Sequence, residues 1–111
     1  MDRLMPDLFD KTGLMKYEFT AKPFRYSIDD SYGWHFVSLP KELAKEIRGN
    51  HKWQEEGWGR MKATVQIGNT EWKTSVWFDT KHDTYLLPVK KEIRRKEKIE
   101  LDKDVDVVIW A

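Results

Sequence analysis

The chain of 111 residues contains no cysteine. This absence excludes disulfides, a thiolate nucleophile and the thiolate-ligated zinc sites that stabilise many small domains. A cysteine-free chain suits a reducing compartment, so we expect a cytoplasmic protein. No apolar run approaches the roughly 20 residues of a membrane-spanning helix, so we expect no membrane partner. The first 14 residues carry three Asp and no apolar core, which argues against a signal peptide.

An excess of charge of one sign is missing as well. There are 20 Lys and Arg residues against 19 Asp and Glu residues, and the net charge of +1 favours neither a polyanion nor a membrane surface as partner. The histidines, His35, His51 and His82, are far apart and show no metal-ligand spacing such as H-x-x-x-H. The best local cluster, His82 with Asp79 and Asp83, is typical of a solvated loop. We therefore expect no metal, no cofactor and no catalytic residue, and predict that the protein is not an enzyme.

Aromatic residues and alternating patterns are what the chain does have. Aromatic residues make up 14% and include six Trp, which indicates a core of a few large side chains. Residues 1–14 are expected to be a leader that need not be ordered, and residues 15–111 a single domain. Alternation of apolar and polar residues predicts about six strands. They cover residues 17–22, 34–39, 60–67, 70–78, 84–89 and 105–110.

Turn signals separate these strands. The Gly-Asn step at residues 68–69 predicts a tight hairpin. Residues 27–33 are expected to form a loop.

Two segments repeat one pattern, in which a strand ends in Leu-Pro and a short helix follows. Proline cannot donate to a strand ladder but has the φ of a first helical turn, so Leu-Pro ends pairing and begins a helix. The predicted helices cover residues 40–48 and 89–98, and Gly49 is the expected residue after the first. Each would carry an apolar stripe that covers one end of a small barrel. The stripes are Leu43 with Ile47 and Val89 with Ile93. A chance recurrence of two Leu-Pro steps is the alternative.

The order of these motifs resembles known families. The stretch "LPVKKEIRRKEKIELDKDVDVVI" is similar to swapped-hairpin DNA-binding proteins of the AbrB/MazE type. The longer run through "MKYEFTAK", "WHFVSLPKEL", "GWG", "WKTSVWF", "YLLPVKKEIR" and "DVDVVI" resembles domain of unknown function 1905. This resemblance covers about residues 15–111 and implies a double-split β-barrel capped by helices. It implies that one chain supplies both halves that two chains supply in AbrB-like dimers, and it assigns no biochemical role.

One departure from that family concerns the turn before the last strand. The family usually has Gly-Asp there, whereas this chain has "LDKDVD" with no Gly. We therefore expect Asp102 or Lys103 at positive φ, which Asp tolerates better than Lys.

Three tryptophans are the candidate ligand-binding residues. Trp53 and Trp58 lie in the irregular link after the first helix, and Trp77 lies on the hairpin face opposite Trp72. These indoles would line a groove for a small molecule or a peptide. The alternative is that they pack over the end of the barrel.

The second helix carries the strongest local charge, in "KKEIRRKEK". Lys90, Lys91, Arg94 and Arg95 are therefore candidate nucleic-acid contacts, because cations along one helix can approach phosphates. The alternative is a solvated helix face beside the acidic "ELDKDVD". The first helix is nearly neutral, so the two-fold basic surface of AbrB-type DNA binding is missing.

These observations predict a monomeric, mainly β protein, namely a small double-split β-barrel of about six strands capped by two short α-helices. The favoured function is a non-enzymatic binding or accessory module whose partner is an unknown small molecule or protein. The alternative is nucleic-acid binding by the second helix.

Overall fold

The structure is a computed structural model that describes residues 13–29, 32–51, 53, 55 and 59–111. Within them the chain forms seven strands and two helices. In chain order these are β1 (Lys16–Ala21), β2 (Phe24–Asp29), β3 (Tyr32–Ser38), α1 (Lys41–His51), β4 (Arg60–Ile67), β5 (Thr70–Asp79), β6 (Thr84–Pro88), α2 (Lys91–Glu97) and β7 (Val105–Trp110). No helix in these ranges is long and apolar enough to cross a membrane. The predicted leader, residues 1–14, lies outside the described residues except for its last two, so its boundary stays a prediction.

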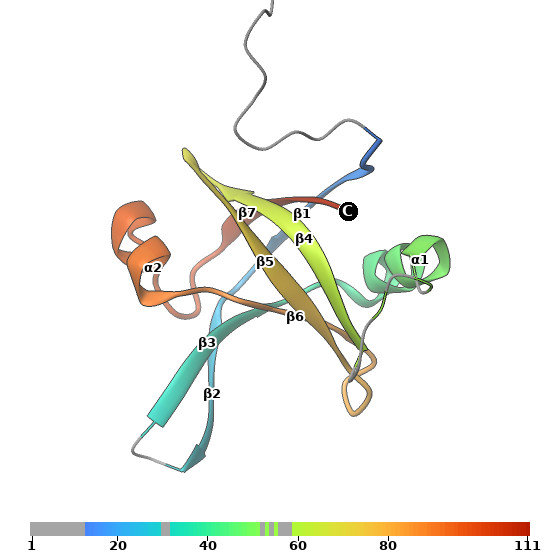
Figure 1. The fold of residues 1–111 in the computed structure, drawn as a ribbon. Helices are drawn as coiled ribbons and strands as arrows, with labels where there is room; N and C mark the ends of the chain where they lie inside the picture. The colour runs from blue at the N-terminus through green and yellow to red at the C-terminus, as the bar shows by residue number, and fades with distance from the viewer. Residues whose placement is uncertain (1–12, 30–31, 52, 54, 56–58) are drawn as a thin grey trace, which may run out of the picture.

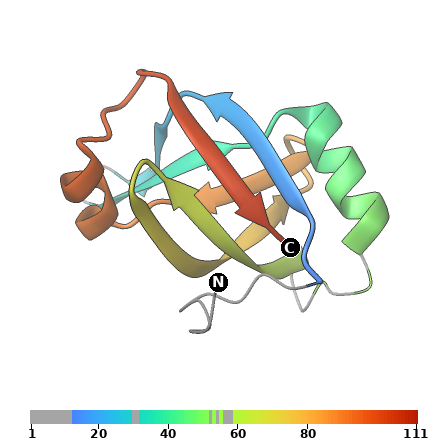
Figure 2. The ribbon, with the colours of Figure 1, turned by 90° about the horizontal axis from the view of Figure 1, so that it is seen from above.

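All seven strands form one antiparallel sheet in the order β1-β7-β4-β5-β6-β3-β2. The sheet curls into a half-barrel, and α1 and α2 lie on opposite sides of it (Figures 1 and 2). The mainly β prediction is confirmed. The closed barrel is wrong, because the end strands β1 and β2 are not paired with each other in the described part of the chain. The chain turns at Pro23, which has no N–H to donate, and β2 then runs along the other end of the sheet.

Strand β2 is the element that the sequence analysis missed, since residues 27–33 were expected to form a loop. β2 pairs with β3 in the register Phe24 with Phe36 and Arg25 with His35, with an irregularity between Tyr26 and Asp29. The signal was present as apolar residues at positions 24, 26 and 28, but Pro23 and the neighbouring Asp and Gly residues are also turn signals. Of the predicted loop, residues 27–29 therefore lie in a seventh strand and residues 32–33 in β3, while residues 30–31 lie outside the described residues.

The β4–β5 hairpin is confirmed. Ile67 pairs with Thr70, and Gly68 supplies the positive φ, +58°, that a two-residue turn requires. The inward faces of the two strands are buried in the core, which they share with β6 and β7. The most completely buried core side chains include Val37, Met61, Val65, Val76, Tyr85, Leu87, Val107 and Ile109. The core therefore lies inside the curl of the sheet, on the concave side.

Both Leu-Pro steps end a strand as predicted. Leu39 and Leu87 are buried, and Ile47 of α1 and Ile93 of α2 are buried as well. Helix α1 lies against β6, and α2 lies against β5. That the helices cap the ends of the sheet stays a prediction. Gly49 is not the residue after the first helix, because α1 continues to His51.

The extra turn of α1 has a packing reason. His51 is only 6% exposed, and its Nε2 lies 2.9 Å from the Tyr17 hydroxyl on β1. Asn50 Nδ2 donates to the same hydroxyl at 3.2 Å. Because these tertiary contacts fix both side chains, the helix runs past Gly49, whose low helix propensity would otherwise favour an end there.

The turn before β7 contacts the link between β1 and β2. Asp102 adopts φ +62°, which confirms the expectation for one of the two candidate residues. Its backbone N–H donates to the Pro23 carbonyl at 3.0 Å, and Lys22 Nζ lies 2.8 Å from Asp104 Oδ1. These contacts hold the end of β1 and the start of β2 where the half-barrel opens.

Candidate functional site

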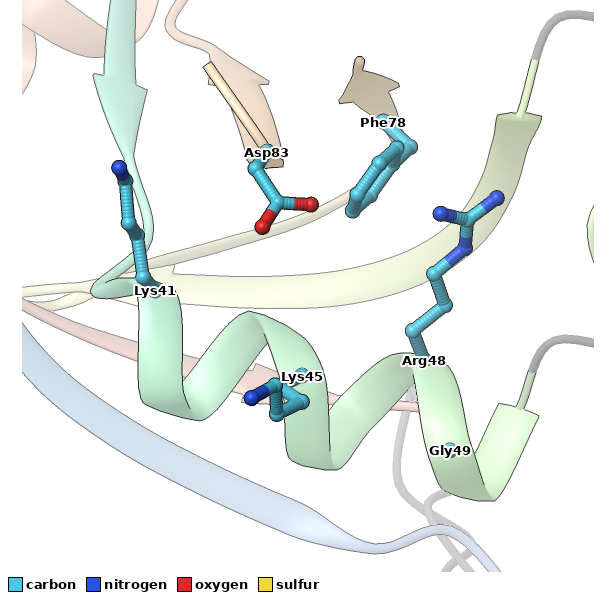
Figure 3. Close-up of a pocket in the computed structure, with 6 residues that line it drawn as sticks. All are labelled: Lys41, Lys45, Arg48, Gly49, Phe78 and Asp83. Atoms are coloured by element: carbon cyan, nitrogen blue, oxygen red, sulfur yellow. The ribbon is translucent and has the colours of Figure 1, made fainter.

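A row of cations on one side of α1 faces a cavity. Lys41, Lys45 and Arg48 are spaced by four and three residues, which places them on one helix face. With Gly49, Phe78 of β5 and Asp83 of the β5–β6 turn they line a cavity of about 310 Å³, called here the Arg48 cavity (Figure 3). In Figure 3, Phe78 on β5 and Asp83 in the β5–β6 turn lie across from the helix, with Lys41 at the start of α1 and Arg48 in its last turn.

Arg48 is held in place by two partners, Glu55 and Phe78. Its Nε and Nη2 donate to Glu55 Oε2 and Oε1 at 3.2 and 3.5 Å. The guanidinium carbon lies 3.8 Å from the centre of the Phe78 ring, a cation–π contact. The Glu55 side chain is only 10% exposed, so this ion pair is shielded from water more than an ordinary surface pair. Arg48 is therefore a fixed positive group at the wall of the cavity.

Tyr85 ties this cluster to the core. Its hydroxyl donates to the Glu55 carboxylate, and its ring meets Phe78 edge to face at 5.2 Å. Burial, and then the hydrogen bond to Glu55, raise the pKa of the Tyr85 hydroxyl well above its ordinary value. Tyr85 therefore stays protonated and acts as a hydrogen-bond donor that positions Glu55, and through it Arg48.

A second cavity lies on the other side of Lys41. It has a volume of about 570 Å³ and is called here the Lys81 cavity. Its lining is Phe24, Ser38, Leu39, Pro40, Lys41, Asp79, Lys81, His82, Thr84 and Leu86. Lys41 therefore belongs to both cavities, and the apolar part of the second comes from β2, β6 and the link between β3 and α1.

The acidic group of the Lys81 cavity is already engaged. His82 Nδ1 donates to Asp79 Oδ2 at 2.5 Å, and the Lys81 backbone N–H donates to Asp79 Oδ1 at 3.0 Å. The hydrogen bond from His82 lowers the pKa of the Asp79 carboxyl. On the opposite wall Thr84 Oγ1 donates to the Leu39 carbonyl at 2.6 Å, which fixes the chain between β3 and α1.

The predicted tryptophan residues are not gathered into one groove. Trp53 is 81% exposed and Trp77 is 50% exposed, and the linings of the two cavities include neither. Trp58 lies outside the described residues. Trp77 is the cross-strand neighbour of Leu86, so its indole lies on the same sheet face, beside the Lys81 cavity. Ligand binding by these residues stays a prediction.

The predicted nucleic-acid contacts on α2 divide into two kinds. Lys90, Lys91 and Arg95 are exposed. Arg94 is half-buried, its Nε donates to the Val89 carbonyl at 3.1 Å, and its Nη1 lies 3.3 Å from His35 Nε2. Arg94 therefore fastens α2 to β3, and the other three form the cationic surface of the helix.

The candidate-site residues that the sequence analysis missed are those of α1. That helix was described as nearly neutral because its two acidic residues, Glu42 and Glu46, offset two of its three cations. The available signal was the spacing of Lys41, Lys45 and Arg48, which puts the cations on one face. The contribution of Glu55, Phe78 and Asp83 had no sequence signal, because the fold brings them together.

The described residues contain no group of three or more His, Asp or Glu side chains placed to hold a metal ion. A search of curated proteins finds no match to this chain. Residues 19–109 match the model of the family described as "Domain of unknown function (DUF1905)", so the chain belongs to that family.

Proposed function

We propose that the domain is a non-enzymatic binding module and that the Arg48 cavity takes a small organic anion. The observation that carries this proposal is the meeting of three cations, Lys41, Lys45 and Arg48, with one carboxylate, Asp83, around a cavity of about 310 Å³. Small-molecule sites usually have volumes of about 300–1,000 Å³ and a few polar groups in an apolar wall. Phe78 supplies the apolar wall here.

The contacts that the three cations already make indicate which of them would bind the anion. Glu55 engages Nε and Nη2 of Arg48, so a bound anion would draw mainly on Lys41 and Lys45. Both lysines are exposed and have mobile side chains with three donors each. Glu55 offsets the charge of Arg48, so the net positive field in the cavity would come from Lys41 and Lys45, and Arg48 would serve as part of a wall that is already in place before the ligand arrives.

Backbone amide NMR titration of the full chain with benzoate and inorganic phosphate tests the proposal. We expect saturable shifts of the amides of Gly49, Phe78 and Asp83, and their loss in Lys45→Glu. Lys96→Glu is the matched control, because Lys96 is an exposed lysine on α2, away from the cavity. The proposal fails if neither anion shifts these amides at millimolar concentration, or if Lys45→Glu binds as well as the control.

A second candidate function is nucleic-acid binding by α2, and the observation that favours it is the exposure of Lys90, Lys91 and Arg95. With three phosphate contacts, the logarithm of the association constant for duplex DNA should fall with the logarithm of the salt concentration, with a slope of about −2.7. Fluorescence anisotropy with duplex and single-stranded DNA at low salt measures this slope. Lys90→Glu combined with Lys91→Glu should abolish the signal, and the absence of binding by the wild-type chain ends this candidate.

A further inference from the structure

The two cavities share a wall, and their chemistry differs. Lys41 lines both. The Arg48 cavity presents three cations, Phe78 and Asp83. The Lys81 cavity combines an apolar part, made by Phe24, Leu39, Pro40 and Leu86, with polar and charged side chains of Ser38, Lys41, Asp79, Lys81, His82 and Thr84. A cationic cavity next to one with an apolar part matches a molecule with a charged head and an apolar tail.

The charges of the Lys81 cavity do not oppose an apolar occupant. The Asp79 carboxylate is paired with His82 at 2.5 Å and with the Lys81 backbone N–H at 3.0 Å. An apolar tail would therefore leave Asp79 with its hydrogen bonds intact, and the penalty for burying an unpaired charge would not arise. Lys81 is exposed, so its ammonium can remain in water while its stem lies along the tail.

Contacts with neighbouring residues hold two parts of the lining of the Lys81 cavity in place. The Phe24 ring packs against Phe36 with centroids 6.1 Å apart. Leu39 is 2% exposed, and its carbonyl accepts from Thr84. Leu86 completes the apolar lining on β6. A tail of several carbons would bury apolar surface against Phe24 and Leu86, which are half-buried, whereas Leu39 is already buried.

We propose that the ligand is an amphiphilic carboxylate whose head binds at Lys41 and Lys45 in the Arg48 cavity and whose alkyl tail extends past Lys41 into the Lys81 cavity. This inference rests on the proposed function, since it places the head in the same cationic cavity. It adds the class of the ligand, a medium-chain monocarboxylate, and assigns specificity for the tail to the Lys81 cavity.

A chain-length series tests the proposal, with butanoate, hexanoate and octanoate as probes and calorimetry as readout. Affinity should rise about fourfold for each added methylene group that is buried, so about 15-fold between successive members. Octylamine has the same number of carbon atoms as octanoate and the opposite charge, and it should bind at least tenfold more weakly than octanoate.

Substitutions at Leu86 and Lys45 test the contributions of the Lys81 cavity and the Arg48 cavity separately. Leu86→Ala should reduce the ratio of the octanoate affinity to the butanoate affinity by about tenfold or more, and should leave butanoate affinity unchanged. Leu101→Ala is the control, because Leu101 is an exposed leucine in the turn before β7 and lines neither cavity. Lys45→Glu should weaken every member of the series equally.

The outcomes distinguish the two proposals. If all carboxylates bind with the same affinity whatever their length, the tail site is refuted while the anion site stands. If octylamine binds as well as octanoate, or if Leu101→Ala acts like Leu86→Ala, adsorption of the alkyl chain explains the data and the tail site is refuted. If no carboxylate binds and benzoate and phosphate do not bind either, both proposals fail.

Discussion

Gly68 in the β4–β5 turn should not tolerate a side chain, and Gly68→Ala is the substitution that shows it. Gly68 has φ +58°, and a Cβ built there would lie 2.0 Å from Glu97 Oε1 at the end of α2. Glu97 accepts a hydrogen bond from Thr70 Oγ1 at 2.6 Å. The turn therefore joins the hairpin to α2, and one methyl group disturbs both the backbone and this contact.

The expected cost has two parts. A non-glycine residue in the left-handed region costs about 1–2 kcal/mol. The Glu97 side chain can rotate away from the new Cβ, but it then gives up the hydrogen bond from Thr70, which contributes about 0.5–1.5 kcal/mol in a half-buried setting. We expect Gly68→Ala to reduce the free energy of unfolding by about 2–3 kcal/mol, and the Tm by roughly 10 °C.

Urea unfolding followed by tryptophan fluorescence measures this change. Gly49→Ala is the matched control with the opposite sign, because Gly49 lies inside α1 and a Cβ there meets nothing within 4 Å. It should stabilise the protein by about 0.5–1 kcal/mol. In a Glu97→Ala background, Gly68→Ala should cost only the backbone part. A Gly68→Ala protein as stable as the wild type would refute the reasoning.

Three further predictions concern buried side chains. Burial lowers the pKa of His51, so the unfolded state binds more protons below about pH 6.5 and stability falls as the pH drops through that value. In His51→Gln the loss of stability between pH 7 and pH 5 should be smaller than in the wild type. An equal loss contradicts the prediction. Ile93→Ala should cost about 2–4 kcal/mol in urea unfolding, because this α2 side chain is 5% exposed, whereas the exposed Lys91→Ala should change stability by less than about 0.5 kcal/mol. Trp72 Nε1 is buried without a hydrogen-bond acceptor among the described residues, so Trp72→Phe removes an unpaired donor and should cost about 1 kcal/mol or less, and a loss above about 3 kcal/mol would count against this.

Much of the local structure could be predicted from the sequence because it depends on neighbouring residues. The Gly-Asn step specifies the β4–β5 turn by itself, and each Leu-Pro step ends one strand and begins one helix. The errors occurred where local signals conflict with tertiary contacts. Gly49 reads as a helix end, but His51 packs on Tyr17 and extends α1. Pro23 reads as the end of pairing, but β2 pairs with β3 beyond it.

The candidate site could be predicted only in part. The spacing of the cations on α1 is visible in the sequence, whereas their meeting with Phe78 and Asp83 is not, because these residues are distant in the chain. Glu55 acquires its role only when Arg48 and Tyr85 lie on either side of it. The exposure of Trp53 and Trp77 likewise depends on where the curl of the sheet leaves them.

The sequence by itself determined the class of the fold, the position of both helices and most strands, and membership of a family, because these follow from short-range backbone preferences and from the order of motifs along the chain. Tertiary structure alone decided that the sheet curls without closing and that the face of α1 with the cations borders two cavities. The physical reason is that strand partners and cavity walls are set by contacts between residues distant in sequence, which no local preference encodes.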